Sequence, residues 1–68
     1  MKLSEYIKAV RTVRGDTQKD FAKRLGKDRA TIANYEAGRS IPPGDVLLKI
    51  QKLDDLTSRI NELKAAEA

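Results

Sequence analysis

The chain has 68 residues, of which 40% are hydrophobic and 35% charged, and it carries a net charge of +4. It contains neither cysteine nor histidine, which excludes disulfide bonds and zinc sites built from those residues. A chain this short has a small core and usually needs a further support, and oligomerisation is the one that remains. No apolar run reaches the roughly 18 residues that a membrane span requires, so we expect a soluble intracellular protein.

The charge is unevenly distributed along the chain. Residues 1–40 contain ten Lys or Arg and five Asp or Glu, a balance of +5, whereas residues 41–68 contain four and five, a balance of −1. A basic first part suits a polyanion such as nucleic acid, although lysine-rich helix faces are also common on solvated surfaces.

Residues 4–14 are predicted to form the first helix. The hydroxyl of Ser4 can cap its first turn, and Glu5 suits the positive end of the helix dipole. Gly15 and Asp16 then predict a turn. Apolar residues at helical spacing define the face expected to be buried: Leu3, Tyr6, Ile7, Val10 and Val13.

Two short helices are predicted next, over residues 18–25 and 29–37. Thr17 and Asp20 have the spacing of a capping box, and Asp28 is the expected cap of the later helix. A glycine follows each helix and can end it. The residues expected to point inward are Phe21, Ala22, Leu25, Ile32, Ala33 and Tyr35.

Residues 39–44 are predicted to be a loop, because two consecutive prolines disfavour helix. A fourth helix starts near Pro43 to Asp45, and no Gly or Pro follows Gly44. We therefore expect helix to about Ala66, either unbroken or with a short break at Asp54-Asp55. The apolar residues of its first part are Val46, Leu47, Leu48, Ile50 and Leu53.

The corner between the two short helices has the pattern of a helix-turn-helix. Gly26 can adopt the left-handed backbone of the turn without strain. Ala22 is small enough for two helices to cross closely, and Ile32 with Leu25 can fix the crossing angle. The sequence thus predicts an all-α fold of four to five helices, with a helix-turn-helix and a helical C-terminal tail.

Residues from about 4 to 53 resemble the lambdoid phage repressors, the Cro proteins and their bacterial relatives. The resemblance implies a compact repressor-like DNA-binding domain over residues 1–53, with residues 54–68 as a C-terminal helical extension. The matching residues are Val10-Arg11, Thr17 through Gly26, Thr31 through Arg39, Pro42 and Leu47 through Ile50.

The resemblance implies that the helix 29–37 enters the major groove of double-stranded DNA. Arginine can pair with guanine, asparagine with adenine, and an alanine methyl can touch the thymine methyl. The implied base-reading residues are Arg29, Ala30, Thr31 and Asn34. The implied backbone-contacting residues are Gln18, Lys27, Arg39 and Ser40. The structural residues of the motif are Ala22, Gly26 and Ile32, with Arg11 and Glu36 as a buried ion pair.

Each site residue also has a structural interpretation. Gln18 is a good first-turn residue, and Asn34 is a poor helix former without an evident local role. Lys27 and Arg29 could be solvated charges, although a positive charge at a helix start opposes the dipole.

The sequence also departs from the family pattern. Asp16 stands where relatives carry an apolar residue, so the packing of the first corner is in question. Gly44 and Gln51 replace apolar or small residues in the fourth helix, and the resemblance ends after Leu53.

The C-terminal tail has apolar residues at alternating three- and four-residue spacing, which favours pairing with a second copy. The alternative is a fifth helix that packs back on its own chain. The residues of the predicted dimerisation face are Leu53, Leu56, Ile60 and Leu63.

These observations predict a homodimeric DNA-binding transcription regulator of phage or bacterial type, a repressor that binds a palindromic operator. We expect it on the nucleoid, in the cytoplasm of a bacterial or phage-infected host cell. No metal or cofactor is expected, and neither is catalysis, because His and Cys are absent and no serine has a plausible base partner. One alternative is an antitoxin-type protein-binding module that autoregulates its operon. Another is an architectural or RNA-binding helical domain.

Overall fold

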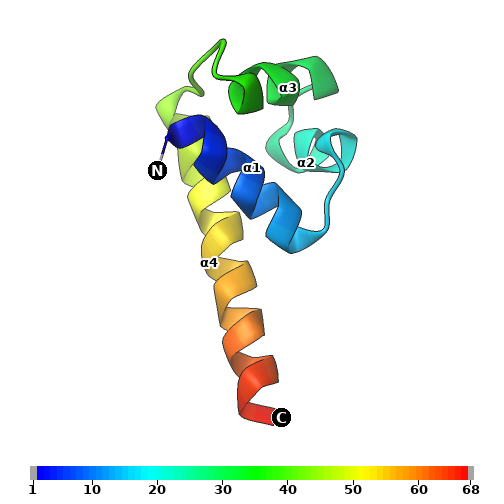
Figure 1. Cartoon of the computed structure of the whole chain (residues 1–68), viewed down its shortest axis with the longest axis vertical. Coiled ribbons are helices and arrows are strands. Elements are labelled where there is room, and N and C mark those ends of the chain that lie inside the picture. Colours follow the sequence, from blue (N-terminus) through cyan, green and yellow to red (C-terminus); the bar gives the residue numbers. More distant parts are fainter. Residues whose placement is uncertain (1, 68) are drawn as a thin grey trace.

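The structure, a computed structural model, describes residues 2–67, and every regular element in that range is a helix. Three short helices, α1 (Leu3–Arg14), α2 (Gln18–Leu25) and α3 (Arg29–Ala37), precede the long α4 (Gly44–Glu67). The short helices and the first turns of α4 form a body, and the rest of α4 extends from it (Figure 1). The molecule measures 40 × 23 × 19 Å. The predicted all-α fold is confirmed, with four helices in the described range.

The start of α1 differs from the prediction. The helix begins at Leu3 with Lys2 in the cap position, and Ser4 already lies within the first turn. The carboxylate of Glu5 accepts a hydrogen bond from the backbone N–H of Lys2 at 3.5 Å. The prediction of Ser4 as the cap was wrong, because Glu5 supplies an acceptor to the residue that precedes the helix.

The ends of α2 and α3 match the prediction. The hydroxyl of Thr17 accepts from the N–H of Asp20 at 3.1 Å, and the carboxylate of Asp28 accepts from the N–H of Thr31 at 2.8 Å. These bonds satisfy N–H groups that the first turn of a helix leaves without partners.

The core lies between the three short helices and the first half of α4. Val13 was expected on the buried face of the first helix but is 64% exposed, and Leu48, an apolar residue of α4, is 58% exposed. Leu48 follows Val46 by two residues, which places it about 200° round the helix from that buried side chain. Val13 lines a shallow groove between α1 and α4 instead of the core. The buried hydrophobic residues that form the core are Ile7, Val10, Phe21, Ala22, Leu25, Ile32, Tyr35, Val46 and Ile50.

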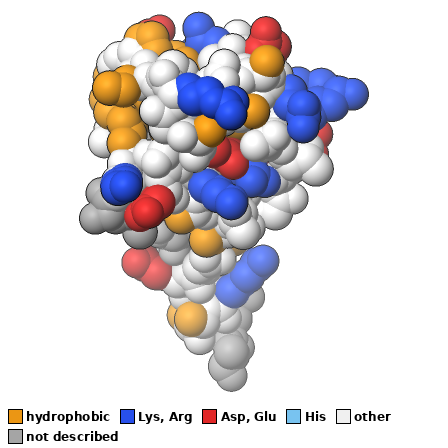
Figure 2. All heavy atoms as spheres, turned by 45° about the horizontal axis from the view of Figure 1, so that its top comes forward, with side chains coloured by type: hydrophobic (Ala, Val, Ile, Leu, Met, Phe, Trp, Pro, Cys, Tyr) orange, Lys and Arg blue, Asp and Glu red, His pale blue; other side chains and the backbone are white. Residues whose placement is uncertain are grey.

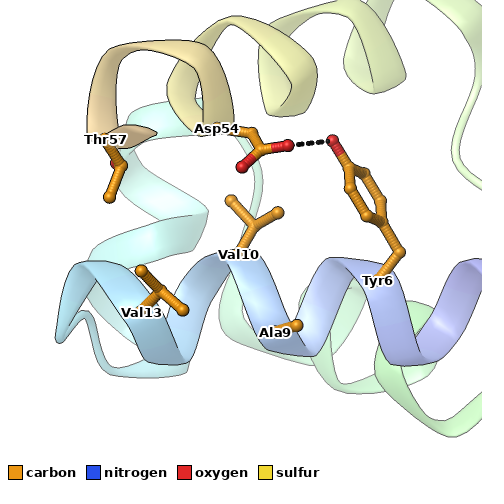
Figure 3. A pocket seen from close by; sticks show the side chains of 6 residues that line it. All are labelled: Tyr6, Ala9, Val10, Val13, Asp54 and Thr57. Atoms are coloured by element: carbon orange, nitrogen blue, oxygen red, sulfur yellow. Dashed lines mark hydrogen bonds between the residues drawn. The ribbon is translucent and has the colours of Figure 1, made fainter. Parts of the chain in front are cut away.

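The tail is the second half of α4, not a separate fifth helix. No break occurs at Asp54-Asp55. The carboxylate of Asp54 accepts from the Tyr6 hydroxyl at 2.9 Å (Figure 3), so it is engaged with α1 and does not compete for the backbone of its own helix. Leu53 is partly buried against the core, whereas Leu56, Ile60 and Leu63 are exposed.

Candidate nucleic-acid interface

A tight corner sets the direction of α3. Gly26 has a φ of +69°, a left-handed conformation that other residues adopt at a cost. The N–H of Lys27 donates to the carbonyl of Ala22 at 2.9 Å, which closes the end of α2. Ala22 and Ile32 are 1% and 0% exposed, so the two helices meet through their buried faces. The opposite face of α3 is left open to solvent.

An ion pair joins α1 to α3. The Nε of Arg11 donates to Glu36 Oε2 at 2.7 Å, and its Nη2 donates to Oε1 at 3.0 Å. The hydrogen bonds to Glu36 raise the pKa of Arg11 above its ordinary value despite burial, which acts in the opposite direction. The side chain of Glu36 is 6% exposed, so the pair is largely removed from water. This two-bonded geometry fixes α3 more firmly than a single surface contact would.

Gln18 is connected to the same pair. Its Nε2 donates to Glu36 Oε1 at 3.3 Å. A primary amide has two N–H donors and one carbonyl acceptor, so one donor and the carbonyl remain for a ligand. Glu36 therefore orients the Gln18 side chain at the N-terminus of α2.

The open face of α3 combines small and polar side chains. Ala30, Asn34 and Ala37 lie about 140–200° round the helix from the buried Ile32. Arg29 and Ala30 are exposed and Asn34 is half-buried. Alanines at the centre allow a ligand to approach the helix closely. Asn34 supplies a longer polar group on this face, and Arg29 supplies another from the exposed first turn, about 60° round the helix from Ile32.

Thr31 lies beside this face but its hydroxyl hydrogen is already engaged. Its Oγ1 donates to Asp28 Oδ1 at 2.7 Å. The bonds from the Thr31 hydroxyl and backbone N–H lower the pKa of Asp28. Thr31 can therefore offer only its oxygen as an acceptor while this cap is intact.

Basic side chains lie at both ends of α3. Lys27 and Arg29 are exposed at its start, and Arg39 and Ser40 are exposed just after its end. The backbone N–H of Arg39 donates to the carbonyl of Asn34 at 3.0 Å. Figure 2, in which the α3 end of the molecule comes forward, shows Lys and Arg side chains at several places over this face.

A second ionic cluster was not predicted from the sequence. Asp16 Oδ2 accepts from the Nε of Arg24 at 2.9 Å and from the Nε of Arg14 at 3.2 Å. Burial alone would raise the pKa of Asp16, but the bonds from the two arginines outweigh it and lower that pKa. Asp16, which departs from the family pattern, therefore forms a cluster of ion pairs in place of an apolar contact. In the sequence, the arginines two residues before it and eight residues after it could have indicated this cluster.

Arg14 also connects the body to α4. Its Nη1 donates to the carbonyl of Leu53 at 3.3 Å and to the hydroxyl of Thr57 at 2.9 Å. Together with the bond between Tyr6 and Asp54, this contact holds the middle of α4 against α1.

Comparison with protein-family models matches residues 7–59 to a family described as helix-turn-helix. This range includes all of α2 and α3 and the corner between them. The chain belongs to the Cro/C1-like helix-turn-helix family. The matched range continues past Leu53, so the start of the C-terminal extension also follows the family pattern.

Among known proteins, similar sequences come from animals and a fungus. Endothelial differentiation-related factor 1 of Homo sapiens is 37% identical over 59 residues, covering 87% of this chain and 40% of that protein. The homologue of Gallus gallus is 36% identical over 59 residues, which again cover 87% of this chain and 40% of that protein. Multiprotein-bridging factor 1 of Eremothecium gossypii is 42% identical over 48 residues, covering 66% of this chain and 32% of that protein. The chain thus spans less than half the length of these relatives. No solved structure matches the chain.

Two further properties concern residues 2–67. No group of acidic side chains there is arranged to hold a metal ion. None of the helices in the described range combines the length and apolar character needed to cross a membrane.

Proposed function

We propose that this helix-turn-helix protein regulates transcription by reading double-stranded DNA with α3 in the major groove. The observation that carries the proposal is the open face of α3, which the corner at Gly26 and the pair of Arg11 with Glu36 hold away from the core. On this face Arg29 can recognise guanine and Asn34 can recognise adenine, while Ala30 can contact a thymine methyl. Thr31 can accept a hydrogen bond beside them.

The surrounding polar residues supply position and affinity. Gln18, oriented by Glu36, and the exposed Ser40 can donate to phosphate oxygens, and Lys27 and Arg39 can neutralise phosphates. These contacts carry little sequence information. Because the centre of the face is alanine-rich, discrimination between sequences depends mainly on Arg29 and Asn34.

Selection of bound duplexes from a random DNA pool tests the proposal. We expect a defined consensus. On that sequence Arg29→Ala should weaken binding by about 1–3 kcal/mol and relax the preference at one base position. Lys52→Ala, which removes an exposed charge on α4, is the matched control and should leave sequence preference unchanged. Equal losses by Arg29→Ala on selected and random duplexes would contradict base reading.

We further propose that the protein is a repressor, acts as a homodimer on a palindromic operator, and blocks polymerase by occupying that site. The exposed Leu56, Ile60 and Leu63 support pairing through α4, with the partly buried Leu53 at its edge. A twofold pair matches half-sites about 34 Å apart. The resemblance to phage and bacterial repressors is the support for a prokaryotic cytoplasm, and the absence of an assignable nucleophile and base supports a non-enzymatic role.

Sedimentation equilibrium tests the pairing. Two copies are expected on a palindromic duplex, with a weaker complex for Leu56→Asp. A single copy on every duplex, at micromolar protein, would remove the homodimer from the proposal while leaving the DNA interface intact.

A second candidate is a module that connects DNA to another protein. The exposed apolar residues of α4 favour it, and one relative is named as a multiprotein-bridging factor. An antitoxin that autoregulates its operon is one form of this candidate, with the tail covering the toxin. Copurification of a defined stoichiometric protein partner would distinguish it from a self-sufficient repressor.

A further inference from the structure

The second half of α4 has an exposed apolar stripe that the body does not cover. Leu56, Ile60 and Leu63 are 55%, 51% and 65% exposed. On a helix of 3.6 residues per turn, Ile60 and Leu63 fall within about 40° of Leu56, so the three side chains form one continuous line. Below we call these residues the α4 stripe.

Basic side chains border the α4 stripe. Lys52 and Arg59 fall within about 60° of Leu56 on one side, and Lys64 about 80° away on the other. The structure places Lys52, Arg59 and the acidic Asp55 with Leu56 around one shallow hollow, and Ile60 with Lys64 around another.

The acidic side chains of residues 52–64 lie farther from the α4 stripe than the basic ones do. Asp55 and Glu62 fall about 100–120° from Leu56, beyond the basic border. Asp54 faces α1 and accepts from the Tyr6 hydroxyl at 2.9 Å (Figure 3). Although residues 52–64 hold three basic and three acidic side chains, the basic ones lie nearer to the α4 stripe.

This charge pattern makes a second copy of the chain a weaker occupant of the α4 stripe than a helix with acidic borders. In paired helices the residues that border the apolar seam face the borders of the partner. Two copies would bring Lys52, Arg59 and Lys64 near their own equivalents, and like charges at such borders oppose pairing. A helix with an apolar stripe and glutamate or aspartate borders would instead meet complementary charges.

We propose that the α4 stripe binds an acidic amphipathic helix of another protein. This partner competes with a second copy of the chain for the same stripe. The stripe is presented in a fixed orientation, because Arg14 bonds Leu53 and Thr57, about 60° and 100° round the helix from Leu56. Little ordering of α4 is therefore needed on binding, which favours affinity. The inference does not require the DNA interface.

A pair of designed peptides tests the proposal with the full chain. Both are helical with leucines at alternating three- and four-residue spacing; one has glutamate borders and the other lysine borders. In fluorescence anisotropy at low salt, we expect the glutamate peptide to bind about tenfold or more tightly than the lysine peptide. An otherwise identical glutamate peptide with its leucines replaced by glutamine should not bind. Equal binding of the glutamate and lysine peptides, or binding of the glutamine peptide, would overturn the proposal.

Variants of the chain identify the binding face. Leu56→Asp should abolish binding of the glutamate peptide, whereas Ser58→Asp, the same new charge on the opposite side of α4, should retain it. Arg59→Glu should reduce the preference for the glutamate peptide, because two of the three basic border residues remain. Circular dichroism checks that the variants stay helical. An unchanged preference in Arg59→Glu would overturn the role of the basic border.

Binding to a short DNA duplex is measured separately on the same variants. A chain that binds the glutamate peptide but no duplex would refute the proposed DNA-reading function and leave this inference standing. A chain that binds a selected duplex but neither peptide would refute this inference and leave the proposed DNA-reading function standing.

Discussion

At the scale of single residues, Asp16 shows how one carboxylate can take the place of an apolar contact. Its side chain is 9% exposed and accepts from Arg14 and Arg24, while its carbonyl accepts from Arg11 Nη1 at 3.0 Å. The residue therefore connects the end of α1, the following turn and α2. Hydrogen bonds to charged groups contribute more than neutral ones, and their loss leaves the Nε–H of the largely buried Arg14 without this partner.

Asp16→Asn should lower the free energy of unfolding by about 1–3 kcal/mol at neutral pH, because a buried charged acceptor is removed. The lowered pKa of Asp16 adds a pH dependence. A depressed folded pKa contributes stability above the ordinary value of 3.8, and that contribution is lost as pH falls through the folded value. Urea unfolding at neutral and acidic pH should therefore show a smaller difference in Asp16→Asn than in the parent. Asp55→Asn on the exposed side of α4 is the control, and an equal effect of both changes would contradict this role.

Tyr6 has the opposite pH dependence. Burial, with the hydrogen bond to Asp54 and the nearby negative charges, raises the pKa of Tyr6 from 10.0 to about 12. The neutral phenol is the bonded form, so its contribution is complete below pH 10.0 and is lost as pH rises towards 12. Titration of phenolate absorbance should show a late component that disappears in Tyr6→Phe. If the late component persists in Tyr6→Phe, it comes from another group and the assignment to Tyr6 is wrong.

At the scale of the helices, caps and breaks were the most predictable features. The bounds of α2 and α3 follow from Thr17, Asp28 and the glycines after each helix, because these residues act locally. Contacts between distant residues were less predictable. Spacing alone did not show that Val13 faces a groove, that Arg14 reaches α4, or that Tyr6 meets Asp54, since these depend on the path of α4 past α1.

For the candidate site residues too, some features could be predicted from the sequence and others depend on contacts between distant residues. The resemblance to the repressor family suggested which side chains of α3 contact bases. Helical periodicity indicates which side chains of α3 are open to solvent. The bond between Thr31 and Asp28 and the bond between Gln18 and Glu36 required three-dimensional positions.

Two glycines provide a matched test of the corner. Gly26→Ala should destabilise the protein by about 1–2 kcal/mol, because alanine is strained at positive φ although no atom lies within 4 Å of the added Cβ. Gly44→Ala, at the start of α4, also meets nothing within 4 Å and has no positive φ, so stability should stay the same or rise slightly. Thermal unfolding of both variants is the measurement. Equal stability of the two would mean that the turn at Gly26 relaxes to another backbone conformation.

At the scale of the whole molecule, the two ends carry different chemistry. The α3 end has basic and small side chains suited to a polyanion, whereas the end of α4 has an apolar line bordered by cations. The core, the contacts of Arg11 and Arg14, and the bond between Tyr6 and Asp54 lie between the two surfaces.

The salt dependence of DNA binding distinguishes these surfaces. Arg39→Ala should weaken binding on all duplexes and reduce the slope of log K against log salt by about 1, because one phosphate contact is lost. Arg59→Ala removes the same side chain from α4 and should leave the slope unchanged. Titrations at about 50 and 200 mM salt measure both. If the two variants lower the slope equally, the DNA path includes the extension.

The unbroken course of α4 has a consequence for insertions and deletions. Each residue added between Val46 and Leu56 would advance the following segment by about 1.5 Å and rotate it by about 100°. One such insertion would turn Leu56, Ile60 and Leu63 to another side of the α4 axis, while the position of α3 would not change. The number of residues between Val46 and Leu56 therefore sets the direction in which the α4 stripe faces relative to α3. A protein bound to the stripe would be oriented by it relative to DNA bound at α3.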